Sequence, residues 1–243
     1  MTTTTDEPER RAAPGSSSPG PWVTVLLLLG ALLYSTWTVE AVLPTGLSPL
    51  HSYVSELAAE GAPYGTFFRT ADLLAGLLVF AGAVVALSRP PRRGWAVVGW
   101  AGLALFGAAT AVDSRLPLSC TPTSSAGCAA REAAGDVPWT HAAHAVSSGL
   151  AVAGALLGMV AFTLAARRSA GRWPVLAPAG PVLLALEAAA TAWTLASVAA
   201  FSAGRGTWGL GAGQRLQVLV IAVWIAVIAW SLAAARRSSR GRA

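Results

Sequence analysis

The sequence predicts an all-α, polytopic membrane protein: a six-helix transmembrane bundle with a short amphipathic interfacial helix in its first outer loop. Composition is the first reason, because 54% of the 243 residues are hydrophobic and only 12% are charged, well below the roughly 25% of soluble domains. Length is the second, because six apolar stretches are close to or above the about 20 helical residues that cross a bilayer. The third is that the sequence lacks the alternating segments of a membrane β-barrel.

The first predicted transmembrane helix covers residues 21–43, and the other five cover residues 67–88, 94–112, 141–166, 176–201 and 214–235. Residues 1–20 are rich in Thr, Ser, Pro and Gly, so we expect a disordered cytoplasmic tail there. The first stretch exceeds the about 7 to 15 apolar residues of a signal peptide, and Glu40 and Pro44 stand where small residues would mark cleavage. We therefore expect it to remain as an anchor in a transmembrane domain of residues 21–235, followed by a basic cytoplasmic tail, 236–243.

Arginine predicts the orientation, because basic loops are retained on the cytoplasmic side. The 17 basic residues are all arginine. Most lie in the two tails and in the second and fourth loops (Arg10, Arg11, Arg89, Arg92, Arg93, Arg167, Arg168, Arg172, Arg236, Arg237, Arg240 and Arg242). Both termini are thus expected in the cytoplasm of a bacterial cell, and the first, third and fifth loops outside. Such charges do not form a nucleic-acid face, so the lipid bilayer is the one partner predicted; protein partners stay unknown.

The third loop contains both cysteines, Cys120 and Cys128. An outward loop meets an oxidising compartment, in which a disulfide persists. The C-x7-C spacing differs from that of a zinc knuckle. We therefore expect the two cysteines to pair, with a gain of about 2 to 3 kcal/mol from closing the loop.

The first outer loop carries the pattern of a short amphipathic helix. Ser48 and Pro49 suit its first positions, and Gly61 and Pro63 suit its end. An advance of about 100° per residue separates an apolar face from a polar one. The apolar face holds Leu50, Tyr53, Val54, Leu57 and Ala58, and the polar face holds His51, Ser52, Ser55 and Glu56. We expect this helix to lie flat at the outer interface.

Ionisable side chains gather toward the outer side of the predicted bundle. We call the expected cluster the polar outer mouth, and its members are Glu40, His51, Glu56, Arg69, Asp113 and Arg215. Asp72 and Glu187 carry a stronger signal, since an acid near the bilayer centre costs about 2.5 to 3.5 kcal/mol. Glu187 lies near the middle of its helix. We expect it to face the bundle interior, protonated or hydrogen-bonded to another helix.

Five short motifs follow one another along the chain. They are HSYVSEL at 51–57, RTADLLAG at 69–76, DSRLPLSC at 113–120 with a second cysteine at 128, HAAHAVSS at 141–148 and GQR at 213–215. Together they resemble the actinobacterial branch of an uncharacterised membrane family, domain of unknown function 998, over about residues 22–235. The resemblance implies a six-helix bundle and a set of outer-face polar positions. It implies no reaction, because the family has none assigned.

Three classes of function are open at this point. The sequence favours a structural, accessory or ligand-binding protein with a polar outer mouth. A second class is a transporter of a small solute or proton, in which Asp72 and Glu187 mark a path from the outer side toward midplane. No internal repeat supports that class.

The third class is a metal-dependent hydrolase of lipid amides or esters. A zinc ion would be held by His51, Asp72, Asp113, His141 and His144, with Ser55, Asp72 and Glu187 as catalytic candidates. This set is loosely similar to the membrane-embedded hydrolases that include alkaline ceramidases, which use three histidines, an aspartate and a serine around zinc. Those proteins have seven helices and a late H-x3-H pair, whereas here H-x2-H opens the fourth predicted helix.

Overall fold

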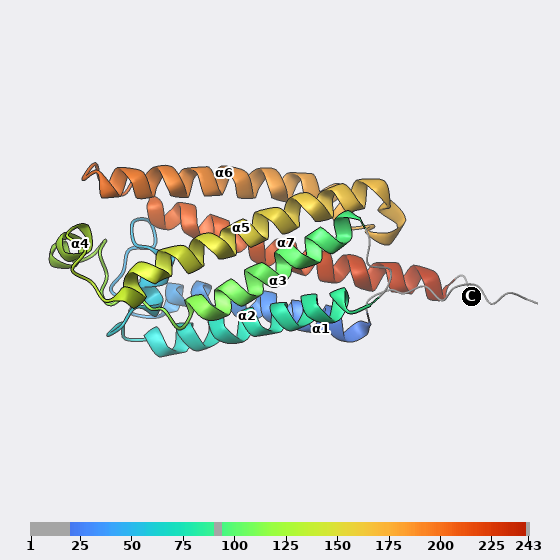
Figure 1. Cartoon of the computed structure of the whole chain (residues 1–243), viewed down its shortest axis with the longest axis horizontal. Helices are drawn as coiled ribbons and strands as arrows, with labels where there is room; N and C mark the ends of the chain where they lie inside the picture. Colours follow the sequence, from blue (N-terminus) through green and yellow to red (C-terminus); the bar gives the residue numbers. More distant parts are fainter. Residues whose placement is uncertain (1–19, 90–93, 242–243) are drawn as a thin grey trace, which may run out of the picture.

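The computed structural model describes residues 20–89 and 94–241, and within them it contains helices and loops but no strand (Figure 1). Six segments are long and apolar enough to cross a membrane: Pro21–Val42, Gly65–Leu87, Trp95–Asp113, Trp139–Arg168, Leu176–Ser202 and Leu210–Arg240. They coincide with the six predicted stretches, which confirms the all-α, multi-pass fold class. Residues 1–19 of the predicted tail, with Arg10 and Arg11, lie outside the described residues, as do Arg92, Arg93 and Arg242.

The first span changes its helical form midway. It begins as α1 (Pro21–Tyr34) and continues as the 3-10 helix η1 (Thr36–Val42). Side-chain hydroxyls donate back to backbone carbonyls at this point, from Ser35 to Ala31 at 2.9 Å and from Thr36 to Leu33 at 2.8 Å. Such back-bonding competes with the α-helical hydrogen bonds and favours the tighter form. The change brings Glu40 to a buried position.

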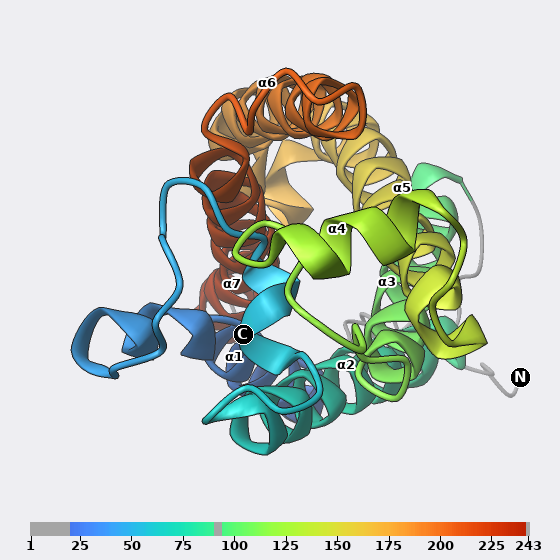
Figure 2. The same cartoon turned by 90° about the vertical axis from the view of Figure 1, so that its left-hand side faces the viewer.

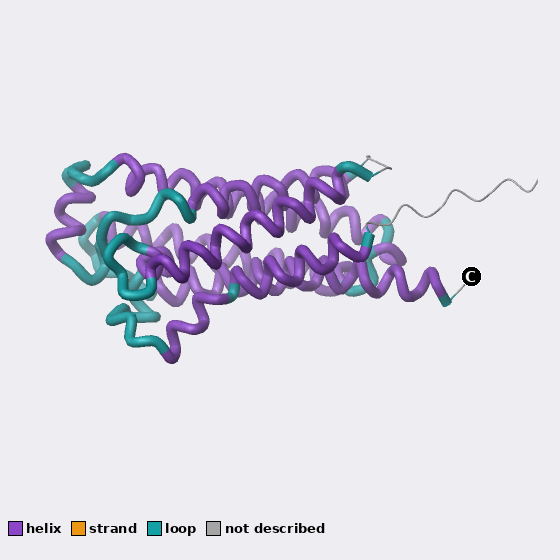
Figure 3. The backbone as a smooth tube through the Cα atoms, turned by 90° about the horizontal axis from the view of Figure 1, so that it is seen from below, coloured by secondary structure: helices purple, strands orange, loops and turns teal. Residues whose placement is uncertain are grey.

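The long helices form a closed ring. They are α1, α2 (Gly65–Leu87), α3 (Trp95–Asp113), α5 (Trp139–Arg168), α6 (Leu176–Ser202) and α7 (Leu210–Arg240). Each packs against the next, and α7 returns to α1. Figure 2 shows this ring along its axis, and Figure 3 shows the connecting loops gathered at its two ends. Arg236 donates to Thr24 at 2.5 Å and to the carbonyl of Gly20 at 3.3 Å, so the two ends of the described chain share one end of the ring.

Glycines allow α3 to approach both of its neighbours closely. A Cβ atom at Gly76 of α2 would lie 2.6 Å from the carbonyl oxygen of Gly107 of α3. On the other side, a Cβ at Gly102 would lie 2.6 Å from the backbone nitrogen of Gly158 of α5. Small residues at helix crossings replace the hydrophobic effect with close packing in lipid. These contacts set the distance at which polar side chains of α2, α3 and α5 meet.

Apolar side chains fill the half of the ring that is nearer the chain ends. This core takes residues from all six helices, among them Val23, Leu27, Val79, Ala83, Leu103, Phe106, Phe162, Leu176, Trp224 and Ile228. The ring of Tyr34 meets that of Phe106 edge-on, with 5.2 Å between their centroids, where the apolar half ends. The other half therefore holds most of the buried polar side chains.

The helix α4 (Ala126–Ala133) lies across the far end of the ring, within the loop that joins α3 to α5 (Figure 2). Ser125 caps it by accepting a hydrogen bond from the backbone nitrogen of Cys128 at 3.3 Å. This helix was not predicted from the sequence. Its signal is present, since a capping serine precedes the helix formers AAREA and Gly135 follows with φ of 71°. We call this side of the ring the α4 end.

The first loop differs from the predicted amphipathic helix. In place of an α-helix it contains turns around Ser52 and the short 3-10 helix η2 (Val54–Ala58). Burial follows the predicted faces only in part. Leu57 is buried and His51 is exposed as expected, but Ser52 and Glu56 are also buried and Leu50 is 52% exposed. Partners elsewhere in the chain satisfy the buried polar groups, and a rule based on local periodicity does not see them.

Candidate functional site

A buried ion pair anchors the first loop to α7. Arg215 donates through Nε to Oε1 of Glu40 at 2.5 Å and through Nη2 to Oε2 at 2.6 Å. Its Nη1 donates to the carbonyl of Ser52 at 2.9 Å. Such two-pronged arginine–carboxylate pairs combine charge with fixed geometry. Both residues belong to the predicted outer mouth. In the structure they pair with each other instead of lining an open site.

The neighbouring residues continue this attachment. The side chain of Gln214 accepts from the backbone nitrogen of Val54 at 2.9 Å. The exposed His51 lies 2.7 Å, Nδ1 to Oγ1, from Thr207 in the loop before α7. Arg69 at the start of α2 donates to the carbonyls of Ala58 and Ala59, at 2.7 and 3.1 Å. His51 and Arg69 thus hold loop segments in place.

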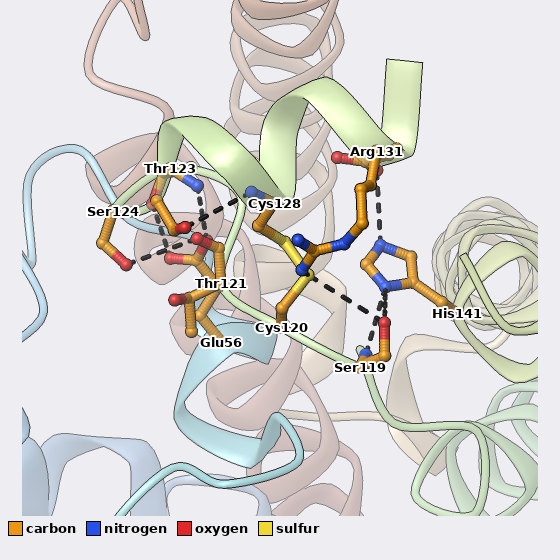
Figure 4. The surroundings of a disulfide bond; sticks show 11 residues. Glu56, Ser119, Cys120, Thr121, Thr123, Ser124, Cys128, Arg131 and His141 are labelled. Carbon is orange, nitrogen blue, oxygen red and sulfur yellow. Dashed lines mark hydrogen bonds and ion pairs between the residues drawn. A yellow bond between two sulfur atoms is a disulfide. The ribbon is translucent and has the colours of Figure 1, made fainter. Parts of the chain in front are cut away.

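Glu56 ties the first loop to the third. Its carboxylate accepts from the backbone nitrogen of Thr123 at 2.7 Å and from the Thr123 hydroxyl at 2.5 Å (Figure 4). The side chain is fully buried. Burial raises the pKa of Glu56, and the hydrogen bonds from Thr123 oppose this rise. Ser55, a neighbouring catalytic candidate, is half-buried in η2.

The disulfide lies beside this junction. Cys120 and Cys128 are joined as predicted, with 6.0 Å between their Cα atoms. His141 at the start of α5 accepts from the backbone nitrogen of Ser119 at 3.1 Å through Nδ1 (Figure 4). Its other nitrogen, Nε2, is 3.6 Å from Glu132 of α4 and is buried without a hydrogen-bond partner. His141 therefore positions the third loop.

His144 and Asp113 form a polar network between α3 and α5. Nδ1 of His144 lies 2.9 Å from the carbonyl oxygen of Leu116 and 3.2 Å from Oδ1 of Asp113. Because a carbonyl only accepts, Nδ1 must carry the proton. Ser147 donates to the same Asp113 oxygen, and Ser148 does so at 3.0 Å. This network uses a pair of serines that sequence spacing alone did not connect to Asp113.

Asp72 lies on the ring-facing side of α2, four residues after Phe68 and four before Gly76, which are both buried. It is only partly buried. Within the described residues no hydrogen bond or ion pair involves it. Asp72 is therefore a carboxyl group in a membrane helix that the surrounding protein leaves without a direct partner.

Glu187 lies inside the ring on α6 and is fully buried. Its Oε1 accepts from Thr191 at 3.3 Å, and Gln217 of α7 donates to the same Thr191 hydroxyl at 2.8 Å. Among the described residues, the second carboxyl oxygen, Oε2, is buried without a hydrogen-bond partner.

The histidines do not gather into one ligand set. His51 bonds Thr207, His141 bonds Ser119, and His144 alone lies beside an acid of the predicted metal site, Asp113. Over residues 20–89 and 94–241, no group of three or more His, Cys, Asp or Glu side chains is placed to hold a metal ion. The zinc site stays a prediction, and among the described residues the His144–Asp113 ion pair is the one that joins two of its expected ligands.

Seven of the polar residues between the middle of the helices and the α4 end are called the polar layer below: Tyr34, Asp72, Thr110, Asp113, His144, Glu187 and Thr194. A family model described as a protein of unknown function, DUF998, matches residues 18–231 of this chain. The chain belongs to the DUF998 family. The matched segment covers the polar layer, the disulfide and the Arg215–Glu40 pair, and it ends within α7.

No curated protein and no solved structure matches this DUF998 chain. The description of DUF998 assigns no reaction. The function of this member must therefore be argued from its own side chains.

Proposed function

We propose that this DUF998 protein is a multi-pass protein of the cell membrane that binds a ligand at its polar layer, without catalysing a reaction. The α4 end faces outward in this proposal, and both termini are cytoplasmic. Arginines support this orientation, because Arg89, Arg168 and Arg236 lie at the end opposite α4. The disulfide supports it too, because such bonds persist in an oxidising compartment.

The observation that carries the proposal is that two carboxyl groups in membrane helices lack partners among the described residues. Asp72 has no hydrogen bond or ion pair, and Oε2 of Glu187 has no hydrogen-bond partner. Buried polar groups in proteins almost always have partners, and one that lacks them indicates a role beyond packing. Ionisable residues in membrane helices are costly and mark functional sites by default. Neither carboxyl group is paired with a cation among the described residues, whereas Glu40 is paired with Arg215.

The apolar core argues for binding from one side. Side chains such as Trp224, Phe162 and Leu103 are fully buried between the polar layer and the cytoplasmic end. A ligand at the polar layer would therefore lie above the apolar core, where the rings of Tyr34 and Phe106 meet. This arrangement favours a binding protein over an open channel.

A ligand screen by thermal unfolding tests the proposal. Purified protein in detergent is heated with amines, amino acids, sugars and carboxylates, and at least one compound should raise the Tm of the wild type. Asp72→Asn should abolish that shift. Asp136→Asn, which changes an exposed acid of the third loop, is the matched control. A shift of equal size in wild type and Asp72→Asn would reject the polar layer as the binding site.

Transport is a second candidate, and Glu187 favours it. Its unpartnered oxygen near the middle of α6 could accept a proton during a cycle that opens the apolar half. In proteoliposomes with a pH gradient, Glu187→Gln should abolish any proton-coupled flux while the variant still folds. Flux equal to that of wild type in this variant would count against transport.

The zinc hydrolase is tested separately, by metal analysis. Zinc content is measured in the wild type and in a His141→Ala, His144→Ala double variant. Stoichiometric zinc in the wild type that is lost in the double variant would support the metal-dependent hydrolase. Lipid turnover that depends on metal would overturn the non-enzymatic proposal.

A further inference from the structure

The end of the ring opposite α4 carries only basic side chains among its described charged residues, and we call it the basic end. Its described arginines lie near the ends of α2, α5 and α7 or in the loop before α6: Arg89, Arg167, Arg168, Arg172, Arg236, Arg237 and Arg240. Of the acids in residues 20–89 and 94–241, Glu187 lies near the middle of α6 and the others lie toward the α4 end. The basic end therefore attracts anions.

Two of these arginines converge on the start of α1. Arg236 of α7 donates to the carbonyl oxygen of Gly20 at 3.3 Å and to the hydroxyl of Thr24 at 2.5 Å. Arg89 follows the end of α2, and its Nη2 lies 3.4 Å from the position that a Cβ atom at Gly20 would take. Because α1 packs between α2 and α7, guanidinium groups from both neighbouring helices meet at Gly20, the residue before α1.

The surroundings of Gly20 suit a negatively charged group. The first turn of α1 contains no acidic side chain, so an approaching anion meets no repulsion from it. The N-terminus of a helix also carries roughly half an elementary positive charge. Arg236 is fixed by its bond to Thr24, whereas Arg89 is exposed and its side chain is able to turn toward a ligand. The site thus combines one fixed and one adjustable guanidinium group.

Exposed apolar side chains continue from this site along α1. Trp22, the second residue of the helix, is 72% exposed. Further along, exposed residues recur every three or four positions and share one face of the helix: Val25, Leu28, Leu29 and Leu32. Tryptophan side chains are enriched at the headgroup level of a bilayer, so Trp22 places Gly20 at that level and the apolar face among the acyl chains. A phospholipid would contact both parts of this surface, whereas a free phosphate ion would not.

We propose that the start of α1, together with Arg89 and Arg236, binds the headgroup phosphate of an anionic phospholipid such as phosphatidylglycerol. The two guanidinium groups donate to the phosphate oxygens, which suit the paired donors of arginine, and the acyl chains lie along the apolar face of α1. Phosphatidylethanolamine carries the same phosphate, but its ammonium group cancels the net charge, so it binds more weakly. This site is at the opposite end of the ring from the polar layer, and its test is independent of the ligand proposed there.

Lipid retention tests this site on the full-length protein. Delipidated protein in detergent is mixed with equal amounts of phosphatidylglycerol and phosphatidylethanolamine, and the lipid retained is measured by native mass spectrometry. We expect the wild type to retain more phosphatidylglycerol. Arg89→Gln should weaken this binding about fivefold, the contribution of one arginine near an anionic lipid surface. Arg236→Gln should weaken it as well, whereas Arg89→Lys should keep most of it, since the charge stays.

Arg167→Gln is the matched control. It removes the same charge from the basic end, but Arg167 is on α5, which stands across the ring from α1 (Figure 2). It should leave the retention of phosphatidylglycerol unchanged. Inorganic phosphate is the second control, compared by thermal unfolding of the wild type and of Arg89→Gln at constant ionic strength. We expect it to raise the Tm of neither protein.

Three outcomes would overturn the proposal. Equal retention of the two lipids by the wild type would contradict the selectivity for an anionic lipid. Equal effects of Arg89→Gln and Arg167→Gln would show that the start of α1 has no role of its own. A Tm increase with inorganic phosphate that Arg89→Gln abolishes would indicate an anion site in place of a lipid site. If Arg236→Gln fails to fold, Arg89→Gln still decides, because Arg89 is exposed.

Discussion

Arg215 and Glu40 form a two-pronged ion pair between two segments that are 175 residues apart, with contacts of 2.5 and 2.6 Å. Both side chains are almost fully buried, 7% and 8% exposed. Removing one partner of such a pair leaves a buried charge without compensation, which costs about 3 to 5 kcal/mol. The pair therefore controls whether η1 and the first loop stay docked on α7.

Glu40→Gln should consequently destabilise the protein by about 3 to 5 kcal/mol, because Arg215 keeps its charge without a counter-ion. Arg215→Lys should also destabilise it, since an ammonium group cannot form the two parallel bonds. The measurement is the midpoint of unfolding in detergent. A Glu40→Leu, Arg215→Leu double variant should recover part of the loss, and additive losses in that variant would contradict the coupling.

The contact between α3 and α5 predicts an unusual response to alanine. Gly102→Ala would place a Cβ atom 2.6 Å from the backbone nitrogen of Gly158, so we expect lower stability by at least about 2 kcal/mol, or failure to fold. Gly149→Ala is the control, because no atom lies within 4 Å of its added Cβ. That variant should be neutral or more stable by up to about 1 kcal/mol. Equal effects of the two would show that α3 and α5 do not meet at Gly102.

Orientation can be tested with the two native cysteines, which are the only ones in the 243-residue sequence. Intact cells are treated with a reductant and then a maleimide, both unable to cross the membrane. We expect labelling of the protein, because the disulfide faces outward in our proposal. Labelling that appears only after the cells are opened would place the α4 end in the cytoplasm and reject the outward orientation.

Glu56 predicts a dependence of stability on pH. Burial raises its pKa in the folded protein above the ordinary value of 4.5, so the folded state binds more protons than the unfolded state as pH rises through that window. The free energy of unfolding should therefore fall from acidic pH upward through the folded pKa. Glu56→Gln should flatten this part of the profile, whereas Glu60→Gln, at an exposed neighbouring acid, should leave it unchanged. If Glu56→Gln leaves the pH profile unaltered, the carboxyl group of Glu56 is not buried in the folded protein.

Several elements could be predicted because their causes are local. The six spans follow from the length and hydropathy of single stretches, and each one lies within a few residues of its predicted position. The pairing of Cys120 with Cys128 was also predicted, from eight residues of separation in one loop. The helix α4 has a local signal as well, in Ser125 and the residues after it, although it was not predicted.

The partners of the residues in the predicted outer mouth could not be predicted from local sequence. Its members were expected to form one cluster, but Arg215 joins Glu40, Glu56 joins Thr123, and Asp113 joins Ser147 and Ser148. His51 and Arg69 instead hold loops. Of the two acids marked for their depth, Asp72 has no hydrogen bond or ion pair among the described residues, and Glu187 has one oxygen, Oε2, without a hydrogen-bond partner.

The amino-acid sequence by itself determined that this chain has six segments long and apolar enough to cross a membrane, because the bilayer acts on each segment separately through its apolar length. Only the tertiary structure decided which polar groups neutralise each other, since Glu40 and Arg215 or Glu56 and Thr123 meet through the closing of the ring. Hydrogen bonds and ion pairs act over a few ångströms, and these partners lie 175 and 67 residues apart along the chain.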